Sequence, residues 1–395
     1  MTINTPSTFA APFGLLYGTI RNVALTNESL SGNGAAGLVG NNVGTIDGVS
    51  VTGLVSGGLV GAGGLVGDNN GAIASSSVNA TVQSSRGASG GLASSNFGNI
   101  TQSSSSGSVS AQFDGAVGGL VGVNYGGTIS ESFSTASVAS TGTFSGPAMV
   151  GGLIGWNQNS PTIHDVYATG SVSGPGFTDT GGLIGRDNAA SGSIARGYAA
   201  GSVSGGFFAG GLVGRNTAFN YTNVYWDTSA TGQGFSTGSG TLVGTGVPTN
   251  LLKVNLPTGF NGSVWGQSNA VNGGYPFLLW QTGTGSPSPP IVLTGSLPAA
   301  ITLYYVADPK PSIYGQPIPT LTGTVTGLLP GDSLATATTG TLQFSTTASS
   351  ASIVGTYPIV GFGLTALGNY VLAQAAANAT AYTINPATLT ITAKD

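Results

Sequence analysis

Few residues in this chain have the types and spacing that catalysis requires. The stretch GFSTG, Gly234–Gly238, matches the G-x-S-x-G pattern of a hydrolase nucleophile elbow. Its base would have to be His164, the one histidine of the chain. This residue precedes Ser236, whereas hydrolases with that elbow place the histidine last. The flanking residues also lack a strand-to-helix pattern, so we interpret the match as chance in a chain rich in glycine and serine.

Motifs for metals and cofactors are equally weak. The zinc motif H-E-x-x-H needs two histidines, and the chain has one. Asp68 is followed by two asparagines that could contact Ca²⁺, but the calcium-binding nonapeptide of β-helices is absent. The stretch GAGGLVG, Gly61–Gly67, approaches a dinucleotide fingerprint without a helix after it. His164 beside Asp165 is interpreted as a solvated corner. The sequence thus predicts no catalytic, cofactor-binding or metal-binding residue and no cofactor.

An enzyme that degrades polysaccharides is the main catalytic alternative. Such enzymes can be built on β-helices, and they need carboxylates that converge on one face. Asp165, Asp187 and Asp227 fall in successive repeats, but each stands at a different offset from the leucine of its repeat. The 12 acidic and 8 basic side chains are spread over 395 residues. We therefore expect a non-catalytic chain.

Two columns of larger side chains could instead contact a ligand. Trp156, Arg186 and Arg215 each stand three positions after a repeat leucine, so we expect them on adjacent coils. An aromatic ring beside two guanidinium groups could hold a sugar or an acidic group, and the alternative is a solvated edge packed by side-chain stems. A second column is aromatic, and we favour a packing ladder over a glycan platform for it: Phe133, Tyr167, Tyr198 and Tyr225.

Composition restricts the class of protein. Charged residues make up 5% of the chain, against roughly 25% in ordinary globular proteins. The net charge of −4 argues against a nucleic-acid partner, which would require a basic face. The absence of cysteine excludes disulfides. Gly48–Gly67 has the length of a membrane span, but 8 of its 20 residues are glycine, each costing about 1 kcal/mol in a helix, so we predict no span.

The elements that position these side chains are sequence repeats. The stretch GGLVGVN, Gly118–Asn124, recurs with variations, and its leucines are 27 to 33 residues apart. These leucines are Leu38, Leu65, Leu92, Leu120, Leu153, Leu183 and Leu212. An isoleucine and a valine follow six of them, always nine residues apart: Ile46, Ile73, Ile100, Ile129, Ile163 and Ile194, then Val55, Val82, Val109, Val138, Val172 and Val203. Periods of this size indicate solenoids, and glycine at this density excludes long helices. Each repeat is predicted to be one coil of a parallel β-helix in which these three columns are buried. Seven such coils would make a β-helix about 35 Å long.

The corners of the coils have a signature of their own. The paired glycines before each leucine should allow the backbone to bend where a Cβ would clash. The asparagines that end the repeats should form a hydrogen-bonded ladder. We place in this ladder Asn42, Asn69, Asn96, Asn124, Asn157, Asn188 and Asn216. A disordered low-complexity tract would not hold a nine-residue spacing six times. An ice-binding β-helix would need threonine at a constant offset, which is not found.

Composition changes after the last repeat and sets the predicted boundaries. Residues 1–216 are the β-helix, and residues 217–280, which hold three of the four tryptophans, are its C-terminal cap. We expect Trp226, Trp265 and Trp280 to pack over the final coil. Residues 281–290 are a Pro/Gly/Ser linker, and residues 291–386 have the short β-rich runs of a small β-sandwich. Residues 387–395 echo the start of that domain and suggest a truncated further repeat.

Two resemblances follow from these residues. The GGLVG stretches with the following GTI and GSVSG, roughly residues 18–216, resemble the GLUG repeat of secreted bacterial surface proteins, such as haemagglutinin-like adhesins and IgA-protease-like exoproteins. "ITLYYVADPKPSIYGQPIP" with "VGTYPI" resembles the MBG domain of bacterial adhesins.

The resemblance implies a right-handed parallel β-helix (all-β), followed by a β-sandwich, in a segment of a longer secreted or cell-surface exoprotein with further repeats. It implies an adhesin stalk or display module whose partner is a glycan or protein on a host or neighbouring cell. The alternative function is a carbohydrate-binding or carbohydrate-degrading β-helix. The first 20 residues lack a basic region and make a poor signal peptide.

Overall fold

The computed structural model describes residues 2–142, 148–217, 220–282, 301–329, 332–367 and 370–389. The chain divides into two compact units, Met1–Leu293 and Thr294–Asp395. Most of the predicted linker, from residue 283 on, and the end of the predicted truncated repeat, from residue 390 on, lie outside the described residues. None of the helices in the described segments combines the length and apolar character needed to cross a bilayer.

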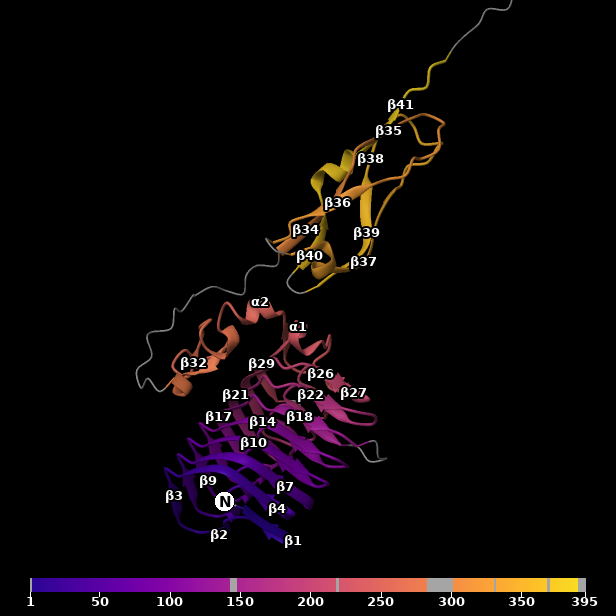
Figure 1. The fold of residues 1–395 in the computed structure, drawn as a ribbon. Coiled ribbons are helices and arrows are strands. Elements are labelled where there is room, and N and C mark those ends of the chain that lie inside the picture. The colour runs from indigo at the N-terminus through magenta and orange to yellow at the C-terminus, as the bar shows by residue number, and fades with distance from the viewer. Residues whose placement is uncertain are drawn as a thin grey trace, which may run out of the picture. The chain divides into compact units, whose positions relative to one another are not determined.

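The first unit is a parallel β-solenoid, as the repeats predicted, and it has about 8 turns where the repeats predicted seven coils. Figure 1 shows the coils stacked one on another, from the indigo N-terminal coil to the pink later ones. One face is a nine-stranded sheet in which each strand pairs in parallel with the equivalent strand of the next coil. Its strands are β2 (Phe13–Leu16), β5 (Val39–Asn42), β8 (Val66–Asn69), β12 (Ala93–Asn96), β16 (Val121–Tyr125), β20 (Ile154–Gln158), β24 (Ile184–Asp187), β28 (Val213–Asn216) and β30 (Thr237–Gly240).

The remaining faces belong to one 22-stranded sheet. The face that carries the isoleucines consists of β3 (Thr19–Arg21), β6 (Thr45–Asp47), β9 (Ala72–Ala74), β13 (Asn99–Thr101), β17 (Thr128–Ser134), β21 (Thr162–Ala168), β25 (Ser193–Ala199) and β29 (Tyr221–Asp227). The face that carries the valines consists of β1 (Thr2–Ala10), β4 (Ala24–Ala36), β7 (Ser50–Gly63), β10 (Ser77–Ser84), β14 (Ser104–Ala111), β18 (Ser137–Ser140), β22 (Val172–Gly174) and β26 (Val203–Gly205). Short strands then lead back to the first sheet: β11 (Ala88–Gly90), β15 (Ala116–Gly118), β19 (Met149–Gly151), β23 (Asp179–Gly181) and β27 (Phe208–Gly210).

The three predicted columns form the core of the solenoid. The repeat leucines are buried, and each backbone N–H from Leu38 to Leu183 donates to the carbonyl of the next leucine at 2.8–2.9 Å. The isoleucines and valines pair with their equivalents in the neighbouring coils, as in Ile100 with Ile129 and Val109 with Val138. They too are buried. The stretch Gly48–Gly67 contains strand β7, from which Val51, Val55 and Ala62 enter this core.

The paired glycines allow close approach of backbone to backbone. A Cβ on Gly118 would lie 1.8 Å from the carbonyl oxygen of Val121, and a Cβ on Gly119 would lie 2.1 Å from that of Gly152 in the next coil. Neither distance is tolerated by any other residue type. The glycines of the repeat therefore set the spacing of the corner, as predicted.

The end of the solenoid is closed differently from the prediction. Trp226 joins the core of the solenoid, while β30 and β31 (Thr245–Val247) pair with strands of the last coil. Trp265 and Trp280, in contrast, lie on the flank, against the aromatic side chains of β17, β21 and β25. The placement of these two tryptophans over the final coil was wrong, because their aromatic partners lie on the flank.

The segment that covers the flank, residues 248–282, is called the strap below. It contains α2 (Thr249–Leu252), β32 (Trp265–Gly266), η1 (Asn272–Gly274), β33 (Phe277–Leu278) and η2 (Leu279–Thr282), and it follows α1 (Thr228–Thr231). Figure 1 shows β32 and α2 in orange beside the C-terminal coils. Its core is shared with the coils, because Leu252, Phe260 and Trp265 pack in one cluster with Tyr167 and Tyr198.

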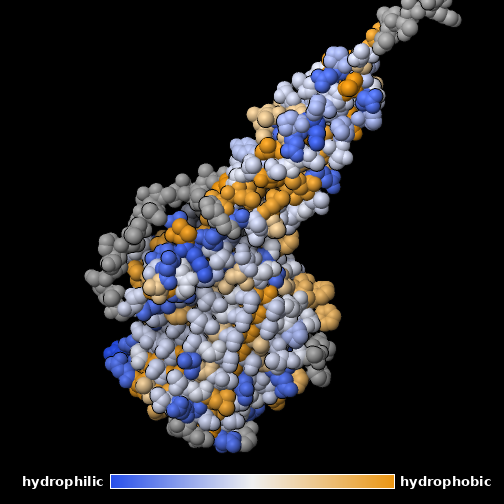
Figure 2. Space-filling model, turned by 45° about the horizontal axis from the view of Figure 1, so that its top comes forward, coloured by the Kyte–Doolittle hydropathy of each residue, from blue (hydrophilic) through white to orange (hydrophobic). Residues whose placement is uncertain are grey.

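The second unit is built of small sheets with a core of its own. Its elements are β34 (Ile301–Ala307), β35 (Lys310–Ile313), β36 (Gly323–Thr326), α3 (Leu334–Ala337), β37 (Thr338–Thr346), β38 (Gly355–Tyr357), β39 (Ile359–Ala366), β40 (Tyr370–Gln374), η3 (Ala376–Thr380) and β41 (Tyr382–Asn385). The sheets have the orders β36-β34-β40, β35-β41-β38 and β37-β39. Ile359, Tyr382 and Ile384 are buried between them. Apolar surface is visible on this unit in orange in Figure 2, and its exposed side chains include Ile353 and Phe362.

Candidate functional site

The asparagine ladder runs through one corner of the solenoid and ends in an acid. Side-chain amides of successive coils donate to one another at 2.8–3.1 Å, and the residues are Asn42, Asn69, Asn96, Asn124 and Asn157. The next member is Asp187, whose Oδ1 accepts from Asn157 Nδ2 at 3.1 Å. The assignment of Asn188 to the ladder was wrong, because the repeat GGLIGRDN carries an aspartate at that position. Asn188 instead accepts a hydrogen bond from Trp156 Nε1 at 2.7 Å.

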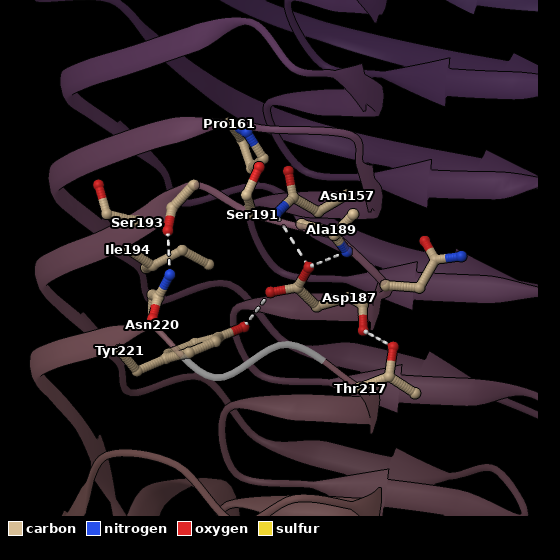
Figure 3. Close-up of a pocket in the computed structure, with 13 residues that line it drawn as sticks. Asn157, Pro161, Asp187, Ala189, Ser191, Ser193, Ile194, Thr217, Asn220 and Tyr221 are labelled. Atoms are coloured by element: carbon tan, nitrogen blue, oxygen red, sulfur yellow. Dashed lines mark hydrogen bonds between the residues drawn. The ribbon is translucent and has the colours of Figure 1, made fainter.

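A hollow of about 230 Å³ opens where the ladder ends. Figure 3 shows Asp187 in this hollow, with its carboxylate directed toward Asn157, Ala189 and Tyr221. Tyr221 donates to Asp187 Oδ2 at 2.6 Å and the backbone N–H of Ala189 donates to Oδ1 at 3.2 Å. Burial raises the pKa of Asp187, and these hydrogen bonds only partly oppose the effect. A buried carboxylate with a raised pKa in a hollow is a feature that functional sites share with structural pairs.

The predicted ligand-contact residues meet on the outer side of the nine-stranded sheet. Trp156 pairs in register with Arg186, and Arg186 with Arg215, so the three side chains occupy adjacent coils as expected. The Arg186 guanidinium lies 6.0 Å from the Trp156 ring centre. In the earlier coils the same column consists of Leu15, Asn41, Asp68, Ser95 and Val123.

A second column faces these residues across the corner between the two sheets. Met149, Asp179 and Phe208 are in register there. Met149 packs with Val123 and Trp156 in an apolar cluster, whereas Asp179 is fully buried and forms ion pairs with Arg186 and, at 3.3 Å, with Arg215. Burial raises the pKa of Asp179, although both guanidinium groups oppose this shift.

Arg215 has a second partner in this corner. Its guanidinium stands 4.4 Å from the ring centre of Phe208. Phe208 meets Phe207 edge to face at 4.8 Å, and Phe207 lies 5.7 Å from Phe177. The last two rings are 65% and 69% exposed. These phenylalanines could not be added from the sequence, because they lie in corners whose length varies between repeats.

The aromatic column on the opposite side is covered by the strap. Phe133, Tyr167 and Tyr198 stack at 4.7 and 5.1 Å between ring centres, and Tyr198 is followed by Tyr225 in the next coil. The hydroxyl of Tyr198 donates to Pro276 O at 2.7 Å. These rings are therefore a packing ladder rather than an open platform.

A polar column beside these rings escaped the sequence analysis. The residue two positions after each isoleucine adopts a positive φ, and the series contains Ser75, Gln102, Glu131, Asp165 and Arg196. Asp165 is 3% exposed, so its interpretation as a solvated corner was wrong. Its carboxylate accepts two hydrogen bonds from Arg196, one from Trp265 Nε1 and one from His164. Burial alone would raise the pKa of Asp165, but these donors outweigh it and lower the pKa. The constant offset from the isoleucine was the signal that could have revealed this column.

Metal ligands do not converge in the described part of the chain, where no group of three or more acidic or histidine side chains is placed to hold an ion. Ser236, the serine of the elbow-like stretch, is buried, and its Oγ accepts from Val243 N at 3.0 Å. It therefore supports the turn that closes the last coil.

Comparisons with known proteins identify two modules. Residues 146–173 match the GLUG motif, and residues 303–380 match the MBG domain of the YGX type. The chain thus contains a GLUG motif followed by an MBG domain, which confirms the two resemblances and their order.

Two further proteins are similar to the chain. Halomucin of Haloquadratum walsbyi is 40% identical over 90 residues, which are 22% of this chain and 1% of that protein. The chain therefore corresponds to a very small part of that relative. These matches fit a surface protein. Among solved structures, a protein from Bacteroides ovatus, described provisionally as an immunoglobulin A1 protease, is 19% identical, with a TM-score of 0.39 over 66% of this chain and 75% of its own.

Proposed function

We propose that this chain is a non-catalytic display and adhesion segment of a secreted, cell-surface protein with further repeats. The observation that carries the proposal is the unbroken stack of buried leucines from Leu38 to Leu212. A solenoid of this kind is stiff and presents outward side chains at a fixed interval. The GLUG motif, the MBG domain and the match to halomucin support a place outside the cell. Its partner would be a glycan or protein on a host or neighbouring cell.

The hydrogen bonds of the carboxylates support the non-catalytic part of this proposal. Asp165 is held by Arg196 and Trp265, and Asp187 closes the ladder. Asp227 caps α1 by accepting from the backbone N–H groups of Ser229 and Ala230 at 2.9 and 2.8 Å. Glycoside hydrolysis requires two carboxyl groups that flank one bond, and each of these three is occupied by its own structural donors.

Surface display of the full chain on a non-adherent bacterium tests the proposal. Displaying cells are expected to attach to host or bacterial cell layers more than vector cells do, and an excess of free purified chain should block attachment. Attachment equal to that of vector cells on every layer would contradict the adhesive function. Cells that display the Arg86→Gln variant serve as a control, because this substitution removes one charge at an exposed edge.

The hollow around Asp187 favours a carbohydrate-degrading enzyme as the second candidate function. A carboxyl group with a raised pKa in a polar hollow can act as a general acid. Purified chain incubated with a panel of polysaccharides should release no reducing ends or unsaturated products if the first proposal holds. Turnover that disappears in Asp187→Asn, with the fold retained by circular dichroism, would establish the enzyme instead.

A further inference from the structure

We propose that the corner formed by Trp156, Arg186, Arg215, Phe208, Phe207 and Phe177 binds an acidic polysaccharide through its carboxylate or sulfate groups. The inference deepens the proposed function, on which it rests, by naming the class of ligand and the face that takes it.

The first argument is the balance of charge. Asp179 is buried between Met149 and Phe208, so it must be compensated by a cation at this position. Arg186, whose side chain is 17% exposed, hydrogen-bonds and ion-pairs with it. Arg215 adds a second positive charge to a carboxylate that is already neutralised. Its side chain is 39% exposed, so the surplus charge is accessible to solvent.

The second argument is the orientation of this charge. A guanidinium carries five N–H donors in a rigid plane that suits the two oxygens of a carboxylate or the oxygens of a sulfate. The Arg215 guanidinium is fixed by two contacts, with Phe208 at 4.4 Å and with Asp179 at 3.3 Å. A cation held in this way loses little side-chain freedom on binding, which is the main cost of using a flexible arginine.

The third argument is the aromatic surface beside the charge. Phe207 and Phe177 leave their rings largely exposed and lie next to Phe208, which contacts Arg215. Aromatic faces pack against the apolar C–H faces of sugar rings while the hydroxyl groups stay in water. On the other side of the arginines, the partly exposed Trp156 provides a further ring.

The arrangement favours a sugar polymer over other anionic polymers. The three residues Trp156, Arg186 and Arg215 follow the axis of the solenoid at about 4.8 Å per coil, which suits an extended chain lying across the coils. An acidic peptide would bind most readily by adding a strand, but β24 is paired on both sides, with β20 and β28. A nucleic acid needs a broad basic face, and the chain carries a net charge of −4.

Binding of the purified chain to defined polymers tests the proposal. The probes are polygalacturonate and dextran sulfate as acidic glycans, neutral dextran, and polyglutamate as an acidic peptide, all at one ionic strength. We expect both acidic glycans to bind and to quench tryptophan fluorescence, and neutral dextran and polyglutamate to bind at least roughly tenfold more weakly. Equal binding of neutral dextran would exclude the role of charge, and equal or tighter binding of polyglutamate would exclude a glycan site.

Variants locate the site. Arg215→Gln removes the surplus charge and leaves Arg186 on Asp179, and we expect roughly tenfold weaker binding, the usual effect of losing one charged hydrogen bond. Phe207→Ser should also weaken binding, since that exposed ring does not support the core. The matched control is Arg86→Gln. The Arg86 guanidinium also lies over an aromatic ring, 5.4 Å from the ring centre of Phe113, but it belongs to another part of the solenoid. Equal weakening by the control would show diffuse charge and overturn the site. Cell attachment that persists when these polymers do not bind would refute this site alone and leave the adhesive function standing.

Discussion

The hydroxyl of Tyr221 donates a hydrogen bond to Oδ2 of Asp187 at 2.6 Å, and this contact joins two exceptions in the repeat. Asp187 stands where earlier coils have a ladder asparagine, and Tyr221 stands in register with Ile194, at the end of the isoleucine column. An aspartate lacks the amide donor that would continue the ladder. A tyrosine in the next coil supplies a donor to it instead, so the two replacements compensate each other.

The pair gives the stability of the solenoid a defined pH dependence. Burial raises the pKa of Asp187 above its ordinary value of 3.8, so the folded chain holds this proton more tightly than the unfolded chain. The stability that this group contributes is fully present below the unfolded pKa and is lost as the pH rises through the folded pKa. Asp187→Asn removes this term. From about pH 3 to about pH 7, the free energy of unfolding should therefore shift in favour of the variant relative to wild type. Urea unfolding across this range measures the difference, and identical pH profiles would contradict it.

Leu120→Asp should break the stack in its middle. Leu120 is fully buried, and its backbone pairs with Leu92 on one side and Leu153 on the other. A lone carboxylate at this position lacks any cation, so the free energy of unfolding should fall by several kcal/mol. Thr81→Asp, on an exposed position of β10, introduces the same group as a control. Denaturant unfolding of both variants provides the comparison, and equal midpoints would be incompatible with a buried leucine column.

Trp265→Ala should loosen the strap. Trp265 is fully buried between Tyr167 and Tyr198, and its Nε1 donates to Asp165 at 2.8 Å. Loss of this ring should cost about 3–5 kcal/mol. Limited proteolysis should then cut residues 248–282 before the coils. Phe235→Ala, which removes a 69% exposed ring, serves as the control and should change neither property. A variant strap that resists cleavage as well as wild type would show that this tryptophan does not hold it.

Truncation after Asn216 should cause end-to-end association. It removes β29, β30 and β31. The edges of β25 and β28, which pair with β29 and β30, are then left with unpaired backbone groups. Removal of residues 294–395 leaves these pairings intact and should leave the first unit monomeric. Sedimentation velocity separates the two truncated proteins. If the protein ending at Asn216 remained monomeric at high concentration, the closing role of these strands would be refuted.

The spacing of single residues predicted the solenoid because each coil repeats the same environment. The leucine, isoleucine and valine columns are all buried as expected, because each of these residues has the same position in every coil. The ladder was misassigned at Asn188 because this asparagine directly follows Asp187. The residue type therefore pointed to Asn188, although Asp187 occupies the ladder position. The place of Trp265 could not be predicted either, because its partners Tyr167 and Tyr198 lie far away in the sequence. The Asp179 ion pairs likewise depend on a corner between two sheets, which no local pattern encodes.

The most direct test of the account is a pair of distances along the solenoid. Ser31 and Ser204 are exposed and lie in one outward column, six strand pairings apart, through Ser56, Gln83, Ser110, Ala139 and Ser173. Because the chain lacks cysteine, spin labels can be attached at chosen cysteine substitutions alone. Coils repeat at about 4.8 Å, so the backbones at Ser31 and Ser204 should be about 29 Å apart, and their labels should give a narrow distance distribution. Labels at Gln83 and Ser204 should give a narrow distribution at a distance about 10 Å shorter. Broad distributions, or two distances that do not differ by two coil spacings, would contradict a rigid stack of coils and with it the display function.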